Sequence, residues 1–169
     1  MEAVEEGEVK VTMDHVDATA ETRVTAAYHE AGHALIAFLH GVRHQSITVD
    51  AEGHGGFVCD RNSLSTEIET MISMAGPASA YLHHKHDRGN VPSLAESITS
   101  DDYWSDTDRR DACKGMELLP PEEHGTIMEQ YWNRTLEILR SRWPIVQAVA
   151  SALVENGKLT DHEIWDLIE

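Results

Sequence analysis

The chain has 169 residues, with 30 acidic and 13 basic side chains and a formal net charge of −17. This length and a hydrophobic content of 41% suit one packed domain better than two. No apolar run approaches the roughly 20 residues that cross a bilayer, and the acidic start lacks the basic residues of an export signal. Such an acidic surface repels phosphate, and two cysteines are too few for a disulfide framework. We therefore expect a cytoplasmic protein that binds neither nucleic acid nor a membrane.

The first half of the chain divides into a leader, a helix and two strands. Residues 1–21 hold seven acids, one base and little apolar periodicity, so we expect a mobile acidic leader ahead of one domain at 22–169. Apolar residues at helical spacing predict a buried helix over 22–40, ended by Gly41. Glycines between β-branched runs then predict two paired strands, at 46–49 and 56–59.

Helices are predicted for most of the remaining chain. The expected segments are 66–82 with a break near Gly76–Pro77, 105–119, 122–140, 143–156 and a short helix from Thr160. Residues 84–103 lack periodicity and are predicted to form a long loop. The expected fold class is α+β, predominantly α-helical, with a small β-sheet or hairpin and a C-terminal helical bundle.

The first predicted helix contains the sequence His29-Glu30-Ala31-Gly32-His33. Histidines four residues apart differ by about 40° around the helix axis, so both imidazoles reach one point beside it. Neutral imidazole binds Zn²⁺, and two such ligands form half of a tetrahedral site. Glu30 lies on the adjoining face, where it can accept the proton of a water molecule that the metal activates for attack on a carbonyl. Burying these polar side chains without partners is costly, which favours a metal site over a hydrogen-bonded histidine pair.

A zinc site of this type needs a third protein ligand. No histidine follows at the spacing of the metzincins. Five aspartates lie between Asp101 and Asp111, and acids that gather near a cation are stabilised. We therefore expect the third ligand to come from this acidic cluster. The small Ala31 and Gly32 are expected to keep the face between the histidines open.

The stretch from Thr25 to Leu35 resembles the zinc-binding helix of the peptidase domain of FtsH-type AAA+ proteases. The resemblance continues in chain order over roughly residues 22–168. The match is looser outside residues 25–35. Residues 42–49, with the glycine-rich turn that follows them, are similar to the family's active-site strand. The other looser segments are 71–80, 107–112 and 157–160. The segment 107–112 is similar to the family's Asn-Asp-Leu-x-x-Ala, with Thr107 in place of Asn and Arg109 in place of Leu.

The resemblance implies one zinc ion per chain and assigns residues to it. The implied ligands are His29, His33 and Asp108, with Glu30 as the catalytic base. Asp106 and Asp111 remain alternatives to Asp108. The resemblance also implies that an unfolded protein or peptide adds as a strand to the edge of residues 46–50. The substrate-binding residues are then Ile47, Thr48 and Val49. Whether residues 84–103 order only when substrate binds is left open by the sequence.

The sequence contains no Walker-type phosphate loop and lacks the family's ATPase module and membrane helices. We therefore expect a zinc-dependent, ATP-independent endopeptidase (HExxH type) that hydrolyses peptide bonds in unfolded or flexible segments. The alternative is a metal-binding, peptidase-like adaptor or regulatory module without proteolytic activity, against which the intact Glu30 argues. A zinc hydrolase for small amides is a third hypothesis and would need a closed cleft. A homo-oligomer and a separate unfoldase are both compatible with the sequence.

Overall fold

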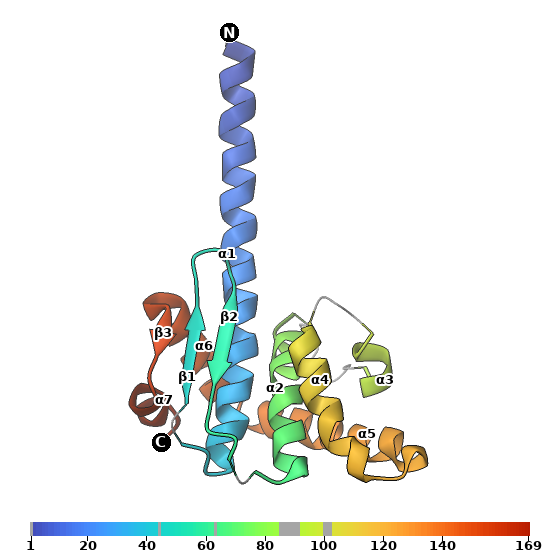
Figure 1. The fold of residues 1–169 in the computed structure, drawn as a ribbon. Coiled ribbons are helices and arrows are strands. Elements are labelled where there is room, and N and C mark those ends of the chain that lie inside the picture. The colour runs from blue at the N-terminus through green and yellow to red at the C-terminus, as the bar shows by residue number, and fades with distance from the viewer. Residues whose placement is uncertain (1, 44, 63, 85–91, 100–102) are drawn as a thin grey trace.

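The computed structural model describes residues 2–43, 45–62, 64–84, 92–99 and 103–169, with side chains from residue 20 onward. The described chain is mostly helical with a small antiparallel sheet, as the expected α+β class requires (Figure 1). The helices are α1 (Glu2–Leu39), α2 (Thr66–His84), α3 (Leu94–Ser97), α4 (Asp106–Lys114), α5 (Pro121–Ser141), α6 (Trp143–Asn156) and α7 (Asp161–Ile168), with a 3₁₀ helix, η1 (Gly115–Leu118), after α4. The strands are β1 (Ser46–Val49), β2 (Gly55–Val58) and β3 (Lys158–Leu159).

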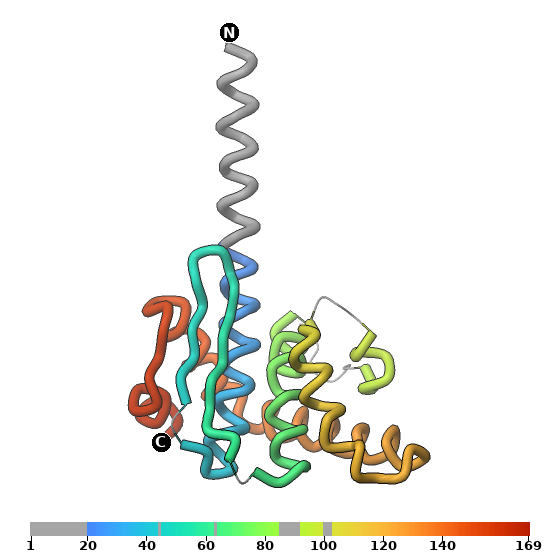
Figure 2. Tube along the Cα trace, viewed as in Figure 1, coloured from blue at the N-terminus to red at the C-terminus, as the bar shows by residue number. Residues whose placement is uncertain are grey.

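Helix α1 runs through the middle of the molecule, and residues 30–37 are all buried. It packs against α2 and α6, and the β1–β2 hairpin lies alongside it (Figure 2). A Cβ at Gly32 would lie 2.5 Å from the Cβ of Ser79 on α2. Glycine at this position is therefore explained by close packing of two helices, and not by an open face between the histidines.

The bounds of α1 take in most of the segment 1–21, where we predicted a mobile leader. The side chains of residues 1–19 lie outside the described part, and the division of the chain at residue 21 stays a prediction. Gly41 follows α1 with a φ value of 74° and ends the helix as expected, and Gly157 follows α6 in the same way with a φ value of 75°. Among the described helices, none combines the length and the apolar character that crossing a bilayer requires.

The sheet has the strand order β2–β1–β3, with both pairs antiparallel. Ile47 of β1 is opposite Phe57 of β2 and Leu159 of β3, so β1 is the central strand. Strand β3 was not predicted, because two residues are too few for an alternating pattern. Both edges of β1 are therefore occupied.

This topology corrects the predicted substrate strand. A peptide cannot add to β1 at Ile47, Thr48 and Val49, because neighbouring strands already occupy both sides of β1 and two of these side chains are buried. Among the described strands, β2 lies at one edge of the sheet and also packs beside α1.

Two helical predictions also need correction. Helix α2 continues through Pro77 without the predicted break, and its packing on α1, α4 and α5 buries it almost continuously from Thr70 to Leu82. Within the predicted loop 84–103, residues 94–97 form α3, whose first turn is capped by the Ser93 hydroxyl. Residues 85–91 and 100–102 lie outside the described part. The short helix predicted from Thr160 is confirmed as α7, which begins with a capping box of Thr160 and Glu163.

Candidate metal centre

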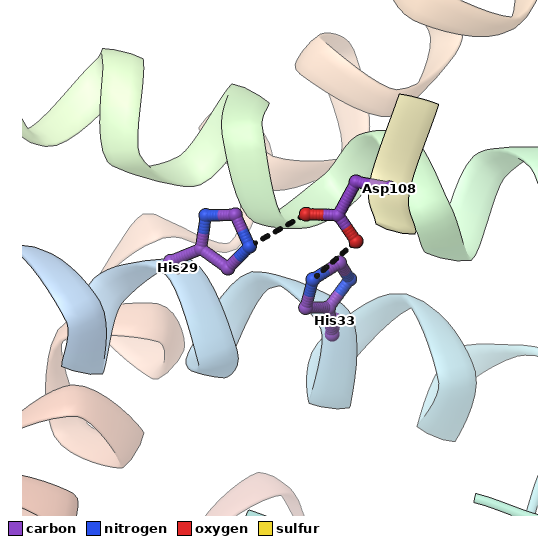
Figure 3. Close-up of side chains that lie close together, drawn as sticks. All are labelled: His29, His33 and Asp108. Atoms are coloured by element: carbon purple, nitrogen blue, oxygen red, sulfur yellow. Dashed lines mark hydrogen bonds and ion pairs between the residues drawn. The ribbon is translucent and has the colours of Figure 1, made fainter. Parts of the chain in front are cut away.

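Three side chains from two helices meet beside the buried part of α1 (Figure 3). His29 and His33 are one turn apart on α1, and Asp108 lies in the first turn of α4. The Nε2 of His29 is 2.9 Å from Oδ2 of Asp108, and the Nε2 of His33 is 3.5 Å from Oδ1 of the same carboxylate. One donor atom from each residue lies within 4.8 Å of the other two. The structure thus brings together the three residues predicted as ligands.

The start of α4 explains why Asp108 meets the histidines and its neighbours do not. The hydroxyl of Ser105 accepts the backbone N–H of Asp108 at 3.0 Å and begins the helix there. Asp106 points to solvent and pairs with Arg109 at 3.3 Å. Asp111 lies one turn further on and pairs with Arg61 at 3.4 Å. The alternatives to Asp108 therefore have other partners, and Asp101 and Asp102 lie outside the described residues.

The spacing from each histidine to Asp108 is close to that of two ligands on one small metal ion. Ligands about 2.0–2.1 Å from one ion at tetrahedral angles are about 3.4 Å apart. The two His–Asp108 distances, 2.9 and 3.5 Å, end on different oxygens of the carboxylate and lie on either side of that value. Two neutral imidazoles and a carboxylate are also the ligand set of a catalytic zinc site.

Gly76 of α2 leaves open the space between the two histidines. A Cβ at this position would lie 2.5 Å from Nε2 of His29 and closer still to Nε2 of His33, which is well inside van der Waals contact. A side chain there would displace both donor nitrogens. Sequence reasoning missed this role and treated Gly76 only as part of a helix break. A glycine costs about 1 kcal/mol in a helix interior relative to alanine, and that cost was the available signal.

The environment of His33 sets its tautomer. Its Nδ1 lies 2.6 Å from the carbonyl oxygen of Ile72, and a carbonyl only accepts, so Nδ1 carries the hydrogen. The neutral ring therefore presents its lone pair from Nε2 toward Asp108. Burial lowers the pKa of His33, but the charge and hydrogen bond of Asp108 outweigh burial and raise the pKa to about 9. Burial raises the pKa of Asp108, but the two histidines outweigh the effect of burial and hold this pKa far below its usual range.

Glu30 is buried beside this cluster, with 6% of its surface exposed. Burial raises the pKa of its carboxyl, and His29 and His33 are near enough to lower it in part. Its Oε2 has no hydrogen-bond partner among the described residues. A buried carboxylate oxygen without a partner is costly, and a water molecule or a proton donor in the adjoining cleft would remove that cost.

These side chains line one cleft of about 1040 Å³. Its walls come from α1, the turn between β1 and β2, strand β2, α2 and residues 103–111. Phe57 of β2 stacks on the ring of His33, with the ring centroids 5.2 Å apart. Glu21 and Asp111 both contribute to the lining, whereas the predicted substrate residues of β1 do not.

In comparisons with models of protein families and with curated proteins, this chain gives no match. The function is therefore argued from the site itself.

Proposed function

We propose that this protein is a zinc-dependent, ATP-independent endopeptidase that hydrolyses peptide bonds in unfolded or flexible protein segments. Its zinc ligands are His29, His33 and Asp108, and Glu30 is its catalytic base. One observation carries the proposal. Donor atoms from residues up to 79 positions apart converge around a space kept open by a glycine, beside a buried carboxylate with an unpartnered oxygen.

Glu30 would perform the proton transfers. A zinc ion held by the three ligands would polarise the peptide carbonyl and lower the pKa of a water molecule. The Glu30 carboxylate accepts the proton of the attacking water, for which burial suits it by raising its pKa toward that of a general base. The resulting carboxylic acid then donates the proton to the nitrogen of the leaving amine, and the base is restored.

The outer edge of β2 is the best place for an extended substrate. Residues of an antiparallel strand alternate between facing their partner strand and facing away. The N–H of Asp50 donates to the carbonyl of His54 at 3.0 Å, and the register then directs the N–H and C=O of Gly56 toward β1. Those of Gly55 and Phe57 point away from β1. A peptide bound to them by main-chain hydrogen bonds would have to be extended and would be read with low sequence selectivity.

The shape of the cleft supports a polymeric substrate. It reaches from Glu21 on α1 to Asp111 on α4, which suits a chain segment better than a small amide. We further infer a domain of the FtsH type, on the resemblance of residues 25–35 and on the position of Asp108, which lies where that resemblance requires the third ligand.

Metal analysis combined with a proteolysis assay tests this proposal. The wild-type chain and Glu30→Gln should each bind one zinc, and the variant should cleave an unfolded protein about 10²- to 10⁴-fold more slowly, since it has lost the general base. Glu52→Gln makes the same change at an exposed carboxylate outside the cleft lining and should cleave normally. Wild-type activity in Glu30→Gln would remove Glu30 from the mechanism. A wild-type chain that binds zinc and cleaves no unfolded protein or peptide library would favour the adaptor or regulatory module.

A further inference from the structure

We propose that Gly55 is a positioning residue for the base. Because it has no side chain, Gly55 lets the carboxylate of Glu30 lie directly against the strand whose outer edge holds the substrate. This inference rests on the proposed function and deepens it, because it names the residue that positions the base relative to the bound peptide.

The contact between Gly55 and Glu30 is the first observation. A Cβ on Gly55 would overlap Oε1 of Glu30 and would lie 2.9 Å from its Cγ and 3.0 Å from its Cδ. The clash therefore involves most of the side chain and not only its flexible end. Glu30 is buried against β2, so a methyl group on residue 55 would have to displace its carboxylate.

The backbone of β2 does not itself require a glycine at this position. Gly55 is not among the described glycines with a positive φ, so its backbone conformation is one that alanine also adopts. The reason for glycine at residue 55 is therefore the space occupied by Glu30.

Alternation along β2 places its inner face over Glu30 and His33. Gly55 and Phe57 lie on the same face because side chains of a strand repeat every two residues. Phe57 covers His33, and Gly55 covers Glu30. The same two residues direct their main-chain groups to the outer edge, so one short stretch of strand touches the base on its face and the substrate on its edge.

Gly56 provides a matched control within the same strand. A Cβ on Gly56 would lie 2.9 Å from Oγ1 of Thr48 on β1, and no atom of Glu30 is within reach of it. Gly55→Ala and Gly56→Ala therefore make the same chemical change on opposite faces of β2.

Urea unfolding tests the contact without any catalysis. Gly55→Ala should lower the urea midpoint in the wild-type background and much less in a Glu30→Ala background, because the second change removes the atoms that the new methyl group meets. Gly56→Ala should shift the midpoint equally in both backgrounds. An equal shift for Gly55→Ala in both backgrounds would overturn the proposal.

Steady-state kinetics test the positioning role. Gly55→Ala should still bind one zinc and should lose kcat by about 10²-fold, the scale expected when a catalytic group moves by about 1 Å, with KM little changed. In a Glu30→Ala background, which removes both the base and the atoms that the methyl group meets, Gly55→Ala should cause little further loss. A loss carried by KM alone, or an equal loss in Gly56→Ala, would overturn the assignment. A wild-type chain that binds zinc and cleaves nothing overturns the proposed function, whereas the urea comparison still decides whether Gly55 holds Glu30.

Discussion

Two groups of histidine and carboxylate side chains in this molecule offer similar donor atoms at similar spacing. One is His29, His33 and Asp108, and the other is Asp50, Glu52 and His54. In both groups, one donor atom per residue lies within 4.8 Å of the others. The first group joins two helices in a partly buried cleft, whereas the second lies exposed on the single turn between β1 and β2.

The two groups differ in the hydrogen bonds that their carboxylates already make. In the turn, Oδ1 of Asp50 accepts the backbone N–H groups of Glu52 and His54 at 3.0 and 2.8 Å, and its Oδ2 lies 3.0 Å from Nδ1 of His54. The hydrogen bond from the His54 backbone is the main cause that lowers the pKa of Asp50. In the cleft, each oxygen of Asp108 faces one imidazole nitrogen. The two groups therefore differ in whether their carboxylates are free of local turn bonds, and on the proposed function the first group is the one that binds zinc.

The largest expected effect comes from filling the space that Gly76 leaves between the two histidines. Gly76→Ala would place a methyl group 2.5 Å from Nε2 of His29 and closer to that of His33. We expect this variant to lose measurable zinc binding, because the methyl group overlaps both donor nitrogens and forces the imidazoles out of position. Isothermal titration with zinc, with circular dichroism to confirm the fold, measures this.

Gly125→Ala is the matched control for this prediction. Gly125 also lies inside a helix, α5, but a Cβ there would meet nothing within 4 Å. Alanine should therefore raise the free energy of unfolding by about 1 kcal/mol through helix propensity and leave zinc binding unchanged. If Gly76→Ala bound zinc as tightly as Gly125→Ala, the ion would have to bind elsewhere.

The next largest effect distinguishes the two carboxylates. Asp108→Asn should weaken zinc binding by roughly 10²- to 10³-fold, the share of one ligand in an apparent binding free energy of about 10–16 kcal/mol. Asp50→Asn should leave zinc affinity unchanged, since its carboxylate serves the turn. Competition with a chromogenic chelator measures both constants, and equal losses in the two variants would mean that the buried cluster is not the zinc site.

The helical part of the site could be predicted from the sequence because it is local. A helix brings residues 29 and 33 together whatever surrounds it, and Glu30 follows from the same five residues. Asp108 could not be separated from Asp106 and Asp111 in this way. Its meeting with α1 depends on how α2 and α4 pack, and only the resemblance favoured it over its neighbours.

The remaining errors concern contacts between distant elements. The substrate strand was assigned to β1 on the resemblance. Strand β3, which occupies the other edge of β1, could not be foreseen because it is two residues long and comes from near the end of the chain. The roles of Gly55 and Gly76 were missed for a related reason. Each depends on what an absent Cβ would touch in another element, and no periodicity along the chain reports that.

A smaller effect than that of the Gly76 and Asp108 variants is expected from pH. The pH dependence of zinc binding should report the coupling between His33 and Asp108. Zinc needs the neutral ring of His33, whose pKa in the folded chain is raised from 6.5 to about 9. Apparent zinc affinity should therefore rise by up to about tenfold per pH unit between pH 7 and pH 9 as one proton is displaced.

The metal-free chain should show the opposite trend. A folded-state pKa above the unfolded value contributes stability that is fully present below pH 6.5 and is lost as the pH rises to about 9. The difference in Tm between zinc-loaded and metal-free protein should then widen over this range. Zinc affinity that did not vary between pH 7 and pH 9 would show that His33 carries no proton for zinc to displace.

The smallest expected effect comes from dismantling the exposed cluster. The double variant Glu52→Gln/His54→Ala removes two of its three donors and leaves the Asp50 carboxylate to accept the backbone N–H groups of the turn. Because these side chains are exposed and supply no donor to the group of His29, His33 and Asp108, we expect one zinc per chain with unchanged affinity, measured by the same chelator competition. Cobalt substitution sharpens the comparison, because the absorption bands of Co²⁺ report on its ligands. The bands should be identical in this variant and in the wild type and altered in Asp108→Asn. A change confined to the double variant would assign the metal to the turn, and burial would then not be what separates the two clusters.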